Sequence, residues 1–103
     1  MGDRTRNARS VTERVELRIE SALAEGAPAD AAEDLLAEGY ARALRLDAER
    51  LRLERTITGL AARADEPAAA QELRRSWLRH RTLLGELSEM RTLLRRLKAG
   101  ATE

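Results

Sequence analysis

The stretch that decides the fold is LRRSWLRHRTLLGELSEMRTLLRRL, residues 73–97. One set of positions recurs in it at alternating intervals of three and four residues, and all but two of them are apolar. The set is Leu73, Ser76, His80, Leu83, Leu87, Met90, Leu94 and Leu97. This spacing places the set on one side of a helix and is typical of a coiled-coil seam.

The preceding segment repeats the same spacing. Its set is Leu36, Gly39, Ala43, Leu46, Arg50, Leu53, Ile57, Leu60 and Ala64. Only ADEP, residues 64–67, separates the two segments, and so short a connection makes the two helices antiparallel neighbours. Folding the chain there pairs residues whose numbers add up to about 133. This rule pairs Leu53 with His80 and Gly39 with Leu94.

A shorter amphipathic segment comes first. Ser10 and Glu13 fit a capping box at a helix start, while Gly26 and Pro28 fit its end. We therefore expect helices over about residues 10–25, 30–64 and 67–99, in a single domain over 10–100. Residues 1–9 are expected to be a disordered polar tail and residues 101–103 a short second tail.

Composition supports an all-α protein. The 103 residues are 43% hydrophobic and 36% charged, and Trp77 and Tyr40 are the only large aromatic residues. The absence of cysteine excludes disulfides and thiolate metal sites. No apolar run approaches the roughly 18 residues of a membrane span, and the N-terminus does not resemble a secretory signal. We expect a cytoplasmic protein, and the excess of arginine over lysine favours a bacterial source.

A second set of apolar residues lies away from the predicted seam. It comprises Tyr40, Leu44, Leu51, Trp77 and Leu84. Exposed apolar surface of this extent usually marks an interface. The N-terminal helix has too few apolar positions to cover all of it. We therefore expect an antiparallel coiled-coil hairpin that forms a homodimeric helical bundle or binds a partner protein. The alternative is a monomeric three-helix bundle.

Polar residues interrupt the seam at Arg50, Ser76 and His80, and they are expected to gather in the middle of the hairpin. Asp47 and Glu54 flank Arg50 at helical spacing, and Glu54 can reach His80. One interpretation is a device that fixes the register of the hairpin. The other is a patch for an anionic or planar ligand, comprising Arg50, Glu54, Ser76, Trp77, Arg79 and His80. A single histidine offers too few ligands for a metal, and no cofactor is expected.

One motif in this region resembles part of a family signature. Glu72-x3-Ser76-x2-Arg79 is similar to the first half of the Glu-x3-Ser-x2-Arg-x3-Gln-x3-Asp signature of RsiG-type anti-sigma factors. Those proteins are coiled-coil hairpins that bind cyclic di-GMP and a sigma factor, which is what the resemblance implies here. The resemblance covers eight residues. Leu83 and Leu87 stand where the signature has Gln and Asp, and there is no second copy.

The sequence contains no phosphate-binding loop and no catalytic motif, so we do not expect an enzyme. A basic patch of Arg91, Arg95, Arg96 and Lys98 could hold the phosphates of a nucleic acid. However, cations are favoured at a helix C-terminus in any case, and Glu33, Asp34 and Glu38 are expected to lie across from them. The sequence therefore predicts a protein–protein interaction module that acts as an adaptor, regulator or assembly subunit. The alternative is a transcription-related regulator of the anti-sigma or nucleotide-responsive kind.

Overall fold

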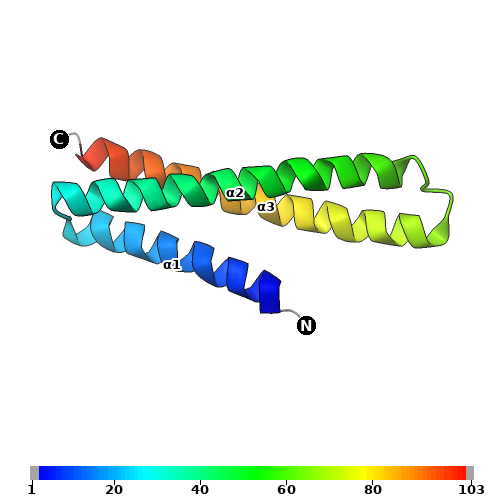
Figure 1. Ribbon diagram of the computed structural model, residues 1–103, viewed down its shortest axis with the longest axis horizontal. Helices are drawn as coiled ribbons and strands as arrows, with labels where there is room; N and C mark the ends of the chain where they lie inside the picture. The colour runs from blue at the N-terminus through cyan, green and yellow to red at the C-terminus, as the bar shows by residue number, and fades with distance from the viewer. Residues whose placement is uncertain (1–2, 102–103) are drawn as a thin grey trace. The chain divides into compact units, whose positions relative to one another are not determined.

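The computed structural model describes the backbone of residues 3–101 and the side chains of residues 11–100. The chain forms three α-helices: α1 (Asp3–Glu25), α2 (Ala29–Ala61) and α3 (Pro67–Ala101) (Figure 1). No strand occurs between residues 3 and 101. The prediction of an all-α protein is confirmed.

The helix ends differ in part from the prediction. α1 begins at Asp3, so Ser10 lies inside the helix and residues 3–9 of the expected disordered tail are helical. Three of these seven residues are arginine, which favours the helix, so α1 extends on the N-terminal side of the capping signal. At the other end, Gly100 does not terminate α3. The rest of the two expected tails, residues 1–2 and 102–103, lies outside the described range.

The connection between α1 and α2 follows the prediction. Gly26 adopts a φ of 79°, the left-handed conformation that ends many helices, and its N–H donates to the carbonyl of Ala22 at 2.8 Å. The Pro28 carbonyl then accepts the N–H of Ala32 at 2.9 Å in the first turn of α2. Gly26 is suited to this place because a residue with a Cβ is strained there.

The second connection is longer than expected, because α2 ends at Ala61 rather than at residue 64. Residues 62–66 form the turn. Within it, the N–H of Arg63 donates to the carbonyl of Leu60 at 3.0 Å, and the N–H of Glu66 donates to the carbonyl of Arg63 at 3.0 Å. Each of these bonds spans three residues instead of four, as in a 3₁₀ turn, and they follow the end of α2 before Pro67 starts α3.

The chain divides into two compact units. Unit 1 contains the residues up to Ala43 together with those from Glu89 onward, and unit 2 contains Leu44–Ser88. Helices α2 and α3 contribute to both units, whereas α1 belongs to unit 1 alone. The single domain over residues 10–100 stays a prediction.

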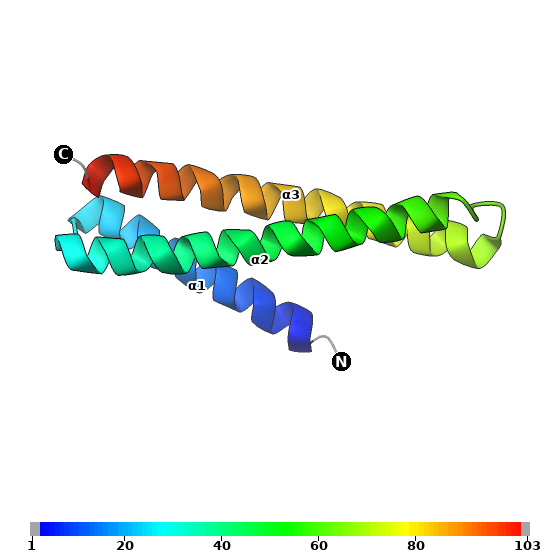
Figure 2. The same ribbon diagram turned by 45° about the horizontal axis from the view of Figure 1, so that its top comes forward.

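Unit 1 is a three-helix arrangement, in which α1 runs back along the N-terminal part of α2 (Figures 1 and 2). Arg42 Nε donates to Thr12 Oγ1 at 2.8 Å, and Arg18 Nη1 pairs with Glu38 Oε2 at 2.7 Å. These contacts make α1 and α2 antiparallel. The buried apolar side chains come from all three helices: Val15, Ile19, Ala32, Leu35, Ala43, Met90, Leu93, Leu94 and Leu97.

A glycine allows close packing inside unit 1. A Cβ built on Gly39 would overlap the Leu94 side chain and would lie 3.4 Å from Cδ1 of Ile19. Gly39 and Leu94 therefore face each other, as the pairing rule predicts. Any larger residue at 39 must push these two side chains apart.

Unit 2 is an antiparallel hairpin of two helices. Its buried residues are Leu46, Ile57, Leu60, Ala69, Ser76, Leu83 and Leu87, most of which belong to the predicted seam. Two contacts cross between the helices: Arg79 Nη2 pairs with Glu49 Oε1 at 2.6 Å, and His80 Nε2 lies 2.8 Å from Glu54 Oε2. The second contact is within one residue of the predicted Leu53–His80 pairing.

None of the helices between residues 3 and 101 combines the length and apolar character that a membrane crossing requires.

Candidate functional site

Unit 2 exposes large apolar side chains that belong to no core. On α2, Leu44 is 71% exposed and Leu51 is 44% exposed; on α3, Trp77 is 53% and Leu84 is 45% exposed. All four were predicted to form an interaction face, and their side chains are accessible. Leu78 of α3 is exposed as well.

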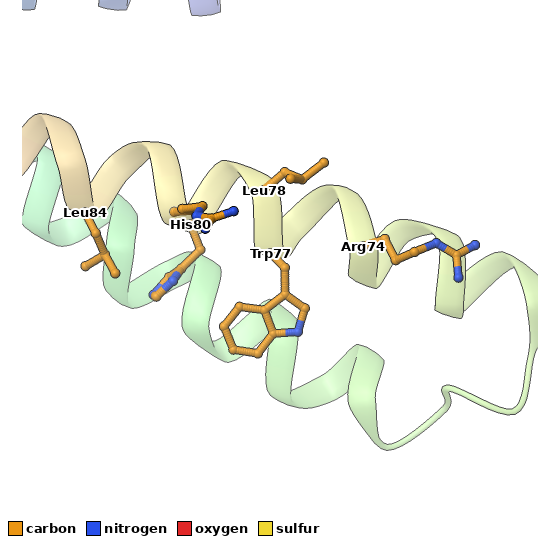
Figure 3. A pocket seen from close by; sticks show the side chains of 6 residues that line it. Arg74, Trp77, Leu78, His80 and Leu84 are labelled. Atoms are coloured by element: carbon orange, nitrogen blue, oxygen red, sulfur yellow. The ribbon is translucent and has the colours of Figure 1, made fainter.

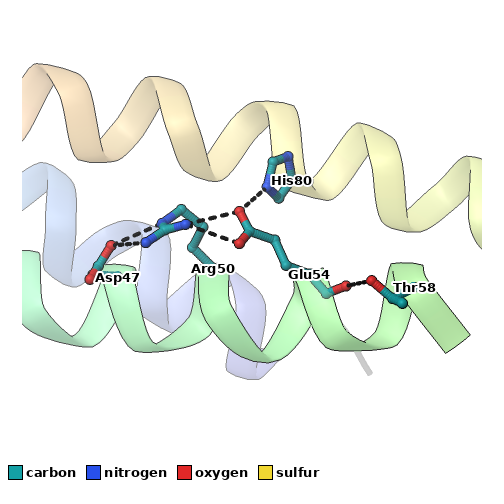
Figure 4. A network of polar contacts seen from close by, with 5 residues as sticks. All are labelled: Asp47, Arg50, Glu54, Thr58 and His80. Atoms are coloured by element: carbon teal, nitrogen blue, oxygen red, sulfur yellow. Dashed lines mark hydrogen bonds and ion pairs between the residues drawn. The ribbon is translucent and has the colours of Figure 1, made fainter.

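A network of polar side chains joins the two helices in unit 2 (Figure 4). Arg50 Nε donates to Asp47 Oδ1 at 2.9 Å, and Arg50 Nη1 donates to Glu54 Oε2 at 2.9 Å. His80 Nε2 donates to the same carboxylate oxygen of Glu54 at 2.8 Å. The predicted flanking of Arg50 by Asp47 and Glu54, and the reach of Glu54 to His80, are confirmed.

The network lies between the exposed apolar residues of the two helices. On α2, Leu44 stands three residues before Asp47, and Leu51 stands three residues before Glu54. The two leucines therefore lie beside the two carboxylates of the network on the surface of α2. On α3, the ring of Trp77 meets the ring of His80 edge to face, with the ring centres 5.6 Å apart. Leu84 is seven residues from Trp77 and so repeats its position two turns later. The four apolar residues therefore share one side of the hairpin, and we call them the apolar face.

Hydrogen bonding changes the acid–base properties of the network. The hydrogen bond from His80, followed by that from Arg50, holds the pKa of Glu54 below its ordinary value of 4.5. The hydrogen bonds to Asp47 and Glu54 raise the pKa of Arg50. Glu54 therefore stays ionised at neutral pH and accepts hydrogen bonds from both Arg50 and His80.

An open hollow of about 600 Å³ lies along α3 beside the network (Figure 3). Its lining consists of Arg74, Trp77, Leu78, His80, Arg81 and Leu84. Trp77, His80 and Leu84 point to one side of the helix in Figure 3, with Leu78 on another. Apolar side chains and two arginines line the hollow, so it suits an apolar side chain that has acidic neighbours.

The predicted ligand patch is only partly open. Arg50, Glu54 and His80 form the network, but Ser76 is buried in the seam, and Arg79 pairs with Glu49 through a contact of 2.6 Å. Two residues of the Glu72-x3-Ser76-x2-Arg79 motif are thus engaged within the hairpin. No group of three metal-ligating side chains occurs among the described residues.

The remaining predicted site residues lie in unit 1. Tyr40 is exposed. In the basic patch, Arg91, Arg95, Arg96 and Lys98 are exposed, and Arg95 Nη2 donates to Thr92 Oγ1 at 3.2 Å. Glu38 pairs with Arg18 of α1 at 2.7 Å. Its expected place across from the basic patch stays a prediction.

Sequence reasoning passed over Arg74 and Arg81, which the hollow brings together with Trp77 and Leu78. It also passed over Leu17, which is exposed on α1. The signal that could have found them is the recurrence of charged and apolar residues every three or four positions on the exposed side of each helix.

A scan of protein-family models, a search of curated proteins and a search of solved structures each find no match to this chain.

Proposed function

We propose that the chain is a small cytoplasmic coiled-coil module for protein–protein interaction, acting as an adaptor, regulator or assembly subunit. The observation that carries the proposal is the apolar face of unit 2: Leu44, Leu51, Trp77 and Leu84 are between 44% and 71% exposed on one side of a two-helix unit. Burying such side chains against a partner is favourable because each removes apolar surface from water.

The polar network gives the interaction its specificity. Asp47, Arg50, Glu54 and His80 hydrogen-bond to one another, so a partner that covers them leaves none of these side chains without a hydrogen bond. They also separate the apolar residues of α2 from those of α3. A helix is the partner element that fits this arrangement, because its side chains can lie in two rows on either side of the network.

The experiment is site-specific photo-crosslinking in an extract of the native host. A photoreactive phenylalanine analogue replaces Leu84 in one preparation and Thr56 in a control. Both positions are exposed, but Thr56 lies on α2, five residues after Leu51 and so away from the apolar face. We expect a discrete adduct from position 84 and none from position 56.

The adduct identifies the partner by mass spectrometry, and this includes adducts with a second copy of the chain. Equal labelling at the two positions, or no adduct from position 84, contradicts the proposal.

A further inference from the structure

The outer side of α1 carries a stripe of exposed residues that its own unit does not use. Glu13, Leu17, Glu20 and Ala24 follow one another at intervals of four, three and four residues, and all of them are exposed. The opposite side of α1 is held in unit 1 by Val15 and Ile19, which are buried. The stripe therefore points away from the core of its unit.

The outer side of α3 carries a second stripe with the same spacing. Arg74, Leu78, Arg81 and Gly85 follow one another at intervals of four, three and four residues, and all of them are exposed. α3 is held in unit 2 by Ser76 and Leu83, which lie in the seam. Part of this second stripe lines the hollow beside Trp77.

The two stripes are complementary position by position. Glutamates on α1 correspond to arginines on α3, each stripe has a central leucine that is 63% exposed, and each ends in a small residue. None of Glu13, Glu20, Arg74 and Arg81 has an ion pair or hydrogen bond with the side chains that the structure describes. The like spacing puts the two charges of each stripe about 10.5 Å apart, so both pairs can form together.

We propose that α1 of one copy packs along α3 of a second copy. Glu13 and Glu20 pair with Arg74 and Arg81, and Leu17 meets Leu78 and enters the hollow beside Trp77. The proposal rests on the proposed function and names a second copy as the partner. A second copy is the occupant because this chain itself carries both halves of the contact and leaves both exposed.

Packing supports a close approach of the two helices. A Cβ built on Gly85 meets no atom within 4 Å, so the surface of α3 is open there. In a dimer with two-fold symmetry the contact occurs twice, once for each α1. Exposed ion pairs add little affinity, so the apolar side chains supply most of it and the charges select the register.

The test reverses the charges of each stripe in turn. The variants Glu13→Arg/Glu20→Arg and Arg74→Glu/Arg81→Glu each place like charges opposite each other in a dimer of identical copies. We expect each variant to dimerise about tenfold or more weakly than the natural chain in low salt. Light scattering measures this against the single-chain mass of 11.5 kDa.

Mixing the two variants supplies the decisive result. In the mixed dimer every arginine meets a glutamate, so the equimolar mixture should recover the mass of two chains while each variant alone stays largely monomeric. Circular dichroism checks that each variant keeps its helices, as expected for exposed substitutions. The control Arg45→Glu/Arg52→Glu makes the same change in net charge as Arg74→Glu/Arg81→Glu, at exposed positions of α2 that are also seven residues apart, and should dimerise like the natural chain.

Three results overturn the proposal: a natural chain that stays monomeric, a mixture that associates no better than its components, or a control as weak as the stripe variants. If the natural chain is monomeric and Leu84 nevertheless crosslinks to another protein, the proposed function stands and the second copy is excluded as its partner.

Discussion

Units 1 and 2 use the same two helices, yet they leave different surfaces in contact with water. In unit 1, Leu35 and Leu93 are buried, in an arrangement to which α1 contributes Val15 and Ile19. In unit 2, Leu44, Leu51, Trp77 and Leu84 are exposed, because two helices bury only the seam between them. The difference teaches that an apolar stripe becomes core only where a further helix covers it. Unit 2 still has room for that helix.

The largest effect is expected from a charge in the seam of unit 2. Leu83 is 1% exposed and its neighbour Leu84 is 45% exposed, so the same substitution probes both sides of the helix. Leu83→Asp buries a carboxylate without a partner and should cost on the order of 4 kcal/mol or more, enough to unfold the hairpin.

Leu84→Asp should keep the helical circular dichroism signal and most of the stability, measured by urea unfolding at a protein concentration too low for association. Equal losses of stability in the two variants would mean that Leu84 is buried in a core and that unit 2 has no exposed apolar face.

A cavity in unit 1 should have the next largest effect. Ile19 is fully buried on α1 next to Gly39 of α2. Ile19→Ala should lower the free energy of unfolding by about 2–5 kcal/mol, because the small side chain leaves space that the three helices cannot refill. Amide hydrogen exchange should accelerate in α1.

The matched variant Leu17→Ala lies on the exposed side of the same helix and should change stability by about 0.5 kcal/mol or less in the monomer. A loss in Leu17→Ala as large as that in Ile19→Ala would show that α1 buries the side we describe as exposed.

Glycine substitutions on α2 compare the packing of the two units more finely. Gly39→Ala in unit 1 forces a methyl group against Leu94 and Ile19, which costs about 1–3 kcal/mol and outweighs the helix propensity gained, about 1 kcal/mol. Gly59→Ala in unit 2 meets nothing within 4 Å and should stabilise the chain by up to about 1 kcal/mol.

Thermal unfolding compares the two variants with the natural chain. Opposite signs are expected for the two glycines, and a stabilising Gly39→Ala would show that α2 and α3 are not closely packed at that point.

The smallest effect concerns acid sensitivity of the network in unit 2. Because the pKa of Glu54 is lowered in the folded chain, its ionised form contributes stability above the unfolded pKa of about 4.5. That contribution is lost as the pH falls through the lower, folded pKa. Glu54→Gln should therefore be less stable than the natural chain near neutral pH, and the difference should disappear in strong acid.

Urea midpoints of both proteins across that range measure the effect. A difference that is independent of pH would assign the loss to packing rather than to the charge of Glu54.

The alternating spacing predicted much of this structure, because it directly reports which residues share a helix side. It identified the seam residues Leu46, Leu83 and Leu94 and the facing of Gly39 and Leu94, all consistent with their burial. It also predicted the contact between Glu54 and His80. These are local consequences of helix geometry and a short connection.

Other features depend on choices that spacing does not encode. The pattern of one helix does not say on which side a third helix packs, so it does not predict that Leu93 is buried in unit 1 while Trp77 is exposed in unit 2. Likewise, Arg42 has a glutamate four residues before it, yet Glu38 pairs with Arg18 and Arg42 donates to Thr12. A long flexible side chain can reach several neighbours, so its actual hydrogen-bond and ion-pair partners are known only once the fold is known.

The scarcity of aromatic residues gives each unit its own optical reporter. Tyr40 in unit 1 is the only tyrosine, and Trp77 in unit 2 is the only tryptophan. Both rings are exposed, and the Trp77 indole lies in edge contact with the His80 imidazole. Because indole emission moves to shorter wavelengths as water is excluded, covering the apolar face of unit 2 would change the colour of the emitted light without any added label. The covering of the apolar face of unit 2 can thus be followed in the unmodified chain, in real time.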